Sequence, residues 1–419
     1  MTPTPNGTGD PAVKRWVWAI LAIFTTIGFG FGNWLARLPA VRDHLGASTF
    51  EMSFYGLCLA AGSTVGLLLA GRTVAWLGPR RAMTTAALVQ AVAMPVASSV
   101  IWTGAVPAGL AVLFVFGFAL STCDVAMNVS GAAAERALGR PRLPLFHAGF
   151  SLGTVSAMGV GALAEAGSVA VPLHLTGVFA AVLVVLLMAL RFVPRNEEDH
   201  RTPSAHTASV AIADGSRRPY VPWKDPRVLL IGSVAMAMSL AEGTAADWLP
   251  LALVDGRGVA NETGALILGV FFVSMTATRL AGSLILARLG RVTVLRGGAI
   301  LCAIGVIIVI LLPASWSIVL GALCWGVGAG LGFPVAISAA ADNPRTAVKS
   351  VAAVSTIAYT AMLLGPMAFG FLGEHIGLLT AFWLLAAIAL MSSLLAGVAR
   401  EPVADVAERR PDDNGRHDA

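Results

Sequence analysis

The chain of 419 residues is 57% hydrophobic and only 12% charged, with a mean hydropathy of +0.79. A soluble protein of this length needs far more charge to cover its surface, so the composition excludes an ordinary soluble domain. The net charge of +5 does not indicate nucleic-acid binding, because the basic residues are spread over many short segments and form no continuous stripe. We therefore expect contact with a lipid bilayer and no nucleic-acid partner.

Long apolar runs alternate with short polar segments, and a helix of about 20 apolar residues crosses a bilayer core. Each run must be helical, because backbone polar groups in lipid need partners within their own segment. In the first half we expect spans at 16–37, 50–70, 82–101, 105–128, 147–166 and 171–192. In the second half we expect spans at 227–250, 263–287, 293–312, 315–338, 349–372 and 377–398. The predicted fold class is an all-α membrane protein with twelve transmembrane helices in two six-helix halves.

Polar segments divide the chain into four parts. Residues 1–192 are expected to form an N-terminal six-helix half, and residues 227–400 a C-terminal one. Residues 193–226 include the run Asn196-Glu197-Glu198-Asp199 and several Ser and Pro residues, a composition that predicts a solvated cytoplasmic linker. Residues 401–419 are expected to form a disordered cytoplasmic tail.

The basic residues predict the orientation of the chain. If the N-terminus is inside, every Lys and Arg falls on the inner side except Arg37, Arg42, Arg257 and Arg279. Basic residues are enriched in cytoplasmic segments of membrane proteins, so both termini are expected in the cytoplasm. An odd number of spans would destroy this alternation. The sequence therefore predicts a multi-pass protein of the cytoplasmic membrane, which we expect to be a monomer.

The two halves show a weak internal repeat. The segment Gly71 to Gly78 after the second span has a counterpart in Gly282 to Gly290 after the eighth. Phe150 aligns with Tyr359, and Gly161 with Gly370, at the same separation along the chain. Repeated halves are typical of transporters that work by alternating access, with the substrate between the halves near the middle of the membrane. The alternative is that any two Gly-rich helices can be aligned.

The segment Gly71-Arg72-Thr73-Val74-Ala75-Trp76-Leu77-Gly78-Pro79-Arg80-Arg81 resembles the G-x-x-x-D-x-x-G-R-R signature of the major facilitator superfamily. It departs from the signature at Ala75, which replaces the acidic residue, and at Pro79, which replaces the first arginine. The role of that acid in the superfamily is therefore not carried over to this chain. Gly71, Arg72, Gly78, Arg80 and Arg81 still fit a tight cytoplasmic turn.

Other segments resemble the branch of this superfamily that includes rhizopine-transport-like membrane proteins. These segments are Gly32-Asn33-Trp34-Leu35-Ala36-Arg37-Leu38-Pro39, Asp124-Val125-Ala126-Met127-Asn128, Phe146-His147-Ala148-Gly149-Phe150-Ser151-Leu152-Gly153, and Glu242-Gly243 with Asp247-Trp248. The resemblance implies the twelve-helix fold and solute transport. It also suggests, weakly, a sugar-like or inositol-like solute.

Ionisable side chains inside a membrane are costly, so those within the predicted spans are candidates for the substrate or proton pathway. Asp124 and Asn128 are four residues apart and share one face of the fourth span. Asp124 is either a proton or substrate site or a structural partner in an ion pair or hydrogen bond to a neighbouring helix. Glu242 and Asp247 form an acidic pair in the seventh span, where Glu242 is a candidate coupling residue. His147 opens the fifth span and is either a surface residue or a residue that acts in gating or proton transfer.

Four more residues belong to this predicted pathway. Arg279 in the eighth span needs a partner, which is either a carboxylate or an anionic substrate group. Tyr359 in the eleventh span is placed to bind a polar solute or to pack in the helix interface. Asn33 and Arg37 lie near the outer end of the first span, and we predict that Arg37 pairs with Asp247 as an outer gate. The alternative is that Arg37 extends to the lipid headgroups.

Two motifs that occur in enzymes have other interpretations here. Gly149-x-Ser151-x-Gly153 matches a nucleophile elbow, but it opens a membrane helix, where small residues favour close packing. The motif Gly159-x-Gly161-x-x-Ala164 lacks the preceding strand of a dinucleotide site. The cysteines lie in apolar runs without metal-like spacing, so we expect no metal and no cofactor. No catalytic constellation is evident, and we expect no enzyme.

The leading hypothesis is therefore a secondary transporter that moves a small polar organic solute by alternating access, coupled to protons. The alternative is a proton-driven exporter of drugs or metabolites. Ala157 stands where superfamily antiporters carry a Gly-Pro motif in the fifth span, which favours the first hypothesis. A cavity lined by polar residues would support the first, and one lined by Phe and Met the second.

Overall fold

A computed structural model describes residues 10–140, 142–194, 220–343 and 346–400. The described residues contain twelve candidate membrane spans, all of them helical. The prediction of an all-α fold with twelve transmembrane helices is thus confirmed. The expected tail at 401–419 and most of the expected linker lie outside the described residues.

The first half follows the predicted order of spans. Its helices are α1 (Pro11–Ala36), α2 (Leu38–Leu45), α3 (Thr49–Leu77), α4 (Pro79–Trp102), α5 (Val106–Leu138), α6 (Leu143–Ala166) and α7 (Val171–Leu190). The first span is α1 and α2 together, interrupted at Arg37, where φ is −105° and ψ is 3°. Pro39 in the first turn of α2 has no backbone N–H, so it cannot donate the hydrogen bond that would continue α1, which explains the interruption.

The second half has the same plan with two breaks. It consists of η2 (Pro222–Lys224), α8 (Pro226–Arg257), α9 (Asn261–Leu280), α10 (Gly282–Leu311), α11 (Ser315–Ala329), α12 (Gly332–Ala340), α13 (Ala347–Ile376), α14 (Leu378–Leu395) and η3 (Ala396–Ala399). The tenth span is α11 and α12 together. Several helices are longer than predicted, because hydropathy marks only the apolar part of a helix, whose ends can continue into water.

Gly78 and Gly290 provide the structural counterpart of the sequence repeat. Gly78 separates α3 from α4 with φ of 77° and ψ of 155°, and Gly290 kinks α10 with φ of 72° and ψ of 161°. Only glycine adopts this conformation without strain. The expected cytoplasmic turn is shorter than predicted, however, because Gly71 and Arg72 lie inside α3 and Arg80 and Arg81 inside α4.

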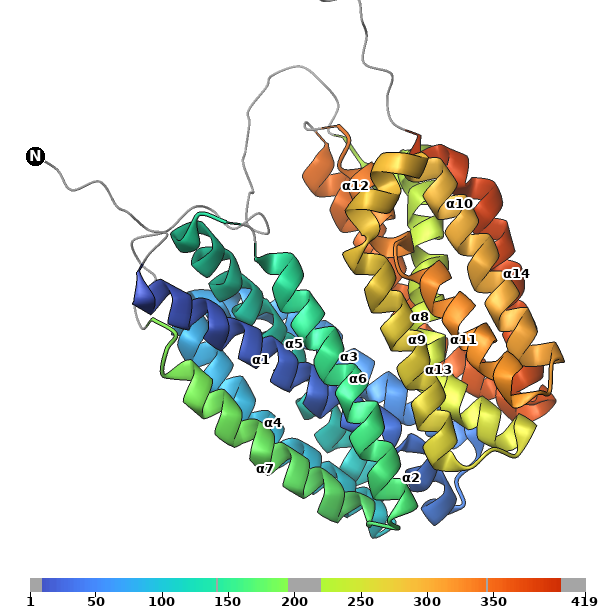
Figure 1. Ribbon diagram of the computed structural model, residues 1–419, viewed down its shortest axis with the longest axis horizontal. Coiled ribbons are helices and arrows are strands. Elements are labelled where there is room, and N and C mark those ends of the chain that lie inside the picture. The colour runs from blue at the N-terminus through green and yellow to red at the C-terminus, as the bar shows by residue number, and fades with distance from the viewer. Residues whose placement is uncertain (1–9, 141, 195–219, 344–345, 401–419) are drawn as a thin grey trace, which may run out of the picture.

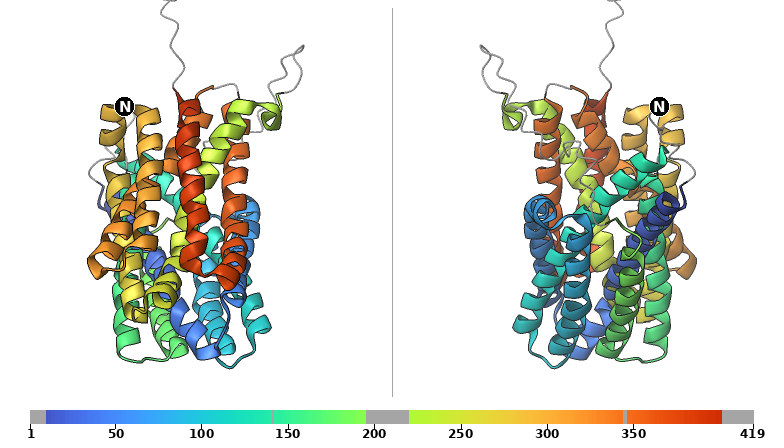
Figure 2. Two further views of the ribbon diagram at one scale, coloured as in Figure 1. Left: turned by 90° about the vertical axis from the view of Figure 1, so that its right-hand side faces the viewer. Right: turned by 90° about the vertical axis from the view of Figure 1, so that its left-hand side faces the viewer.

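The two halves touch at one end and spread apart at the other (Figure 1). We call the end that holds α2 the α2 side, and the end where α1 begins and η3 ends the termini side. On the α2 side α3 packs against α13, and α6 packs against α9. A Cβ added to Gly269 of α9 would lie 3.2 Å from the Met158 Cβ of α6. These two contacts, which we call the seam, close the α2 side, and Figure 2 shows the two bundles from the sides.

Glycines allow helices within the first half to approach closely. A Cβ on Gly28 would overlap the Phe150 carbonyl of α6, and one on Gly62 would overlap the Phe114 carbonyl of α5. Gly153, from the motif that resembles a nucleophile elbow, packs in the same way on the Thr25 carbonyl of α1. The structure thus confirms close packing as the role of these small residues.

Gly153→Val should lower the thermal stability of the purified protein by far more than Gly159→Val. A Cβ at Gly153 would overlap backbone atoms of α1, whereas nothing lies within 4 Å of a Cβ at Gly159. Overpacking of this kind costs typically about 1–3 kcal/mol. Both glycines lie in α6, so the change in helix propensity is matched. Equal melting temperatures for the two variants in detergent would contradict this account of the packing.

Candidate functional site

Polar side chains from both halves face each other near the middle of the molecule. Asp124 of α5 is surrounded by protein, yet its side chain is exposed to solvent. The Asn128 Nδ2 group donates to Asp124 Oδ1 at 3.2 Å and to the Asp124 carbonyl at 2.9 Å. Tyr359 of α13, in the other half, is 40% exposed and close enough to interact electrostatically with Asp124. Because both side chains are exposed and interact although they belong to different halves, we infer an open space between the halves, which we call the central cavity.

A second group of polar residues, from α8, α9 and α6, also includes residues of both halves. Glu242 and Arg279 form an ion pair of 2.7 Å, and each side chain is about one-third exposed. The Arg279 Nε group also donates to the Gly330 carbonyl at 3.0 Å. His147 of α6 is exposed, lies within electrostatic range of Arg279 and packs edge-on against Phe24 at 5.2 Å between ring centroids. The partner that Arg279 needs is thus a carboxylate of its own half.

The predicted gate between Arg37 and Asp247 is wrong. Arg37 is only 2% exposed, pairs with Glu165 of α6 at 3.1 Å and donates to the Val169 carbonyl at 2.6 Å. The break between α1 and α2 at this residue directs its side chain into the first half. Because Arg37 is buried, it does not extend to lipid headgroups either. Asn33 is also fully buried, and its Nδ2 group donates to the Phe29 carbonyl at 2.9 Å.

Asp247 lies instead at the inner edge of the seam. An added Cβ on Gly56 of α3 would lie 3.6 Å from Asp247 Oδ2 and 3.0 Å from the Pro366 Cβ of α13. The carboxylate therefore sits where helices of the two halves cross. Among the described residues it forms no ion pair and no hydrogen bond.

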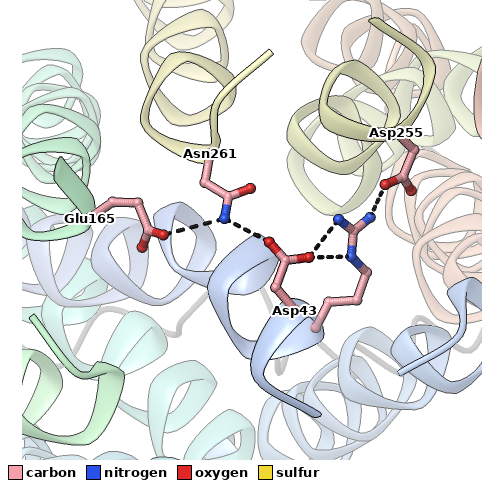
Figure 3. Close-up of polar contacts among 5 residues, drawn as sticks. Asp43, Glu165, Asp255 and Asn261 are labelled. Carbon is pink, nitrogen blue, oxygen red and sulfur yellow. Dashed lines mark hydrogen bonds and ion pairs between the residues drawn. The ribbon is translucent and has the colours of Figure 1, made fainter. Parts of the chain in front are cut away.

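Residues outside the predicted substrate or proton pathway connect the halves on the α2 side. Arg42 of α2 forms ion pairs with Asp43, at 2.7 Å, and with Asp255 of α8. The Asn261 Nδ2 group of α9 donates to Asp43 Oδ2 at 2.8 Å and to Glu165 Oε1 of α6 at 3.3 Å (Figure 3). We call these five residues the polar network. The sequence contained one indication of this network, because Arg42 is among the few basic residues on the predicted outer side.

Comparison with known proteins decides the family. The sequence matches the Major Facilitator Superfamily over residues 143–362 and 266–416. It is 31% identical over 398 residues to an uncharacterized MFS-type transporter of Yersinia pestis, covering 93% of this chain and 96% of the relative. The chain belongs to the Major Facilitator Superfamily. It is a membrane transporter rather than an enzyme, as the sequence predicted.

Other superfamily members show how far the similarity extends. The membrane protein MosC of Rhizobium meliloti is 25% identical over 373 residues, which are 88% of this chain and 86% of MosC. The solved structure of the nucleoside transporter NupG has a TM-score of 0.73 at 15% identity and covers 93% of this chain and 99% of its own. A D-xylose-proton symporter has a TM-score of 0.69 at 14% identity, over 91% and 96% of the two chains. At such identities the structures establish the shared fold.

Packing, rather than charge, holds the superfamily fold closed on the α2 side. The side chain of Asp255 is 42% exposed, and that of Asp43 45%. Exposed ion pairs contribute only about 0.2–1 kcal/mol each. By contrast, the seam brings backbone and side chains into direct contact, as at Gly370, where an added Cβ would overlap the Ser53 side chain. Close packing in the seam therefore closes the α2 side, and the polar network helps to align the two halves.

A separate groove of about 700 Å³ lies between α6, α9 and α11. Its lining is almost entirely apolar and includes Val155, Met158, Leu266 and Val270. None of the predicted pathway residues lines it. Such a surface fits lipid acyl chains better than a polar solute, so we place the candidate site of this transporter in the central cavity instead.

Proposed function

We propose that this superfamily member is a secondary transporter that moves a small polar organic solute, of the sugar or inositol type, by alternating access and in a proton-coupled manner. One observation carries the proposal: a carboxylate, an amide, a phenol and an ion pair from both halves surround the central cavity. These groups suit a solute with several hydroxyl groups, which can both donate and accept hydrogen bonds. NupG and the D-xylose-proton symporter, which share the fold, carry polar solutes.

The alternative function is a proton-driven exporter of drugs or metabolites. The apolar groove between α6, α9 and α11 would suit such compounds better than the central cavity does. Among the described residues that line it, that groove offers a cationic compound no carboxylate or other ionisable side chain, and Ser274 and Thr278 are the polar side chains there. The polar central cavity therefore favours the first function.

The proposal is tested by uptake into proteoliposomes with and without an imposed pH gradient. A panel of sugars, cyclitols and amphipathic cations separates the two functions. We expect accumulation of a polyhydroxylated solute only with the gradient, and a loss of about tenfold or more in Asp124→Asn, because a hydrogen bond to a charged group contributes about 1.5–3 kcal/mol. Glu262→Gln, an acid-to-amide change outside the central cavity, should retain uptake. Accumulation of amphipathic cations alone would contradict the proposal.

We place the termini side in the cytoplasm. The basic residues gather on that side, as they do in cytoplasmic segments generally. With this orientation the seam closes the outer side, and the central cavity opens inward. We also propose that the transporter acts as a monomer in the cytoplasmic membrane.

Reporter fusions check this orientation. A reporter after Ala205 and another at the C-terminus should both indicate the cytoplasm, because an even number of spans returns the chain to the side where it began. A fusion at Ala105, in the turn between α4 and α5, should indicate the outside. An external signal from either of the first two fusions would refute the assignment.

A further inference from the structure

Asp247 differs from the other acidic side chains on the helices around it. The others each have a partner: Glu51 accepts from the Ser48 N–H, Glu374 from the Phe50 N–H, Glu242 pairs with Arg279, and Asp255 pairs with Arg42. Tyr55 of α3 stacks on Trp34, and His375 of α13 bonds to the Phe371 carbonyl. None of these groups acts electrostatically on Asp247. Its carboxylate is therefore without a counter-charge in the described part of the chain.

Two neighbours of Asp247 on α8 are also without partners. Thr244 Oγ1 and Trp248 Nε1 are buried and make no hydrogen bond within the described residues. Thr244 is 3% exposed and Trp248 is 2% exposed. Buried polar groups normally have partners, so these two unpaired groups beside the partly exposed Asp247 carboxylate mark a place that binds something small, such as water or a proton.

The position of Asp247 links it to the movement of the halves. It lies about 15 Å from the outer end of α8, counted along the helical rise. Gly56 and Pro366 cross beside it, one from each half. When α3 and α13 separate to open the outer side, water reaches this point. When they close, as in this structure, the carboxylate is only partly exposed and has no partner among the described residues.

We propose that Asp247 is the proton-binding group of this transporter, and that its protonation permits the outer side to close. An ionised carboxylate without a partner costs several kcal/mol to remove from water, whereas a neutral carboxyl costs much less. In the outward-open state the carboxylate takes a proton from outside, and the neutral acid then fits the closed seam. The proton leaves through the central cavity, which opens to the cytoplasm. This inference rests on the proposed function and names the site of its proton coupling.

Distance measurements test the proposal without a known solute. Spin labels at Ala105→Cys and Ala260→Cys mark the outer ends of the two halves, since both residues are exposed there. The four native cysteines are replaced by alanine in this background. As the pH rises from mildly acidic to mildly alkaline, we expect the ratio of separated to closed outer ends to increase by about tenfold in the otherwise native protein. Asp247→Asn should remain closed at every pH.

Two further variants make the result decisive. Glu262→Gln changes an acidic residue in the first turn of α9 that is not in the group around Asp247, and it should keep the full pH response. Asp247→Glu retains a titratable group and should keep a pH response even if the amide variant does not fold. An unchanged pH response in Asp247→Asn, or no response in the native protein, would overturn the proposal. Failure of the solute screen alone would leave this proton-driven movement intact, so the two proposals fail separately.

Discussion

Gly370→Leu should hold the transporter open on the outer side and abolish net transport. A Cβ at this position of α13 would overlap the Ser53 side chain of α3 and lie 3.2 Å from the Thr49 carbonyl. Ser53 is fully buried in the seam. Overpacking costs about 1–3 kcal/mol, which would reduce the closed population by about 5- to 150-fold. Each half stays intact, because the contact lies between two rigid bundles that can separate.

Distances between spin labels on the outer ends measure this shift directly. Gly370→Leu should show the separated distance, whereas Gly177→Leu should resemble the native protein. Gly177 is also a helical glycine, and nothing lies within 4 Å of a Cβ added there. A native distance distribution in Gly370→Leu would mean that the seam adapts to the larger side chain, and that the contact does not control closure.

Glu242→Gln and Arg279→Gln should each reduce uptake by about 5- to 30-fold, and the double variant should recover most of it. Each single change leaves one member of the 2.7 Å pair without its partner in the membrane interior. Both side chains are about one-third exposed, so water screens part of the loss, and about 1–2 kcal/mol is a reasonable magnitude. The double change removes both charges together.

Measuring uptake with and without the pH gradient gives this experiment its control. If Glu242 only balances Arg279, the double variant should still accumulate solute when the gradient is imposed. If Glu242 carried the coupled proton, the double variant would equilibrate solute without accumulating it, and the role proposed for Asp247 would be contradicted. Arg279→Lys should lie between the native and Gln variants, because lysine keeps the charge but loses the planar, multidentate geometry of arginine.

Charge reversal within the polar network should have smaller effects. Arg42 and Asp255 pair across the halves, but the Asp255 side chain is 42% exposed. The sequence predicted an outer gate formed by an ion pair between Arg37 and Asp247. The structure indicates that closure depends on packing at Ser53, Gly370, Met158 and Gly269, with the polar network around it.

The sequence alone determined the number of spans, the division into halves, the turn glycines Gly78 and Gly290, and the family. These features depend on properties of contiguous residues. A run of apolar residues must be helical in lipid wherever it lies, and a glycine with positive φ is a local requirement. The acidic and basic residues within spans were also evident, because any charge in an apolar run stands out.

Only the tertiary structure decided which charges meet. Arg37 pairs with Glu165, Arg279 with Glu242, and Asn261 with both Asp43 and Glu165. These partners lie far apart in the sequence. Their pairing depends on how each helix is rotated about its axis, which is set by close contacts such as Gly28 on Phe150 and by the break at Arg37. Periodicity places a residue on a face of its helix, but the packing of all twelve spans decides what that face meets.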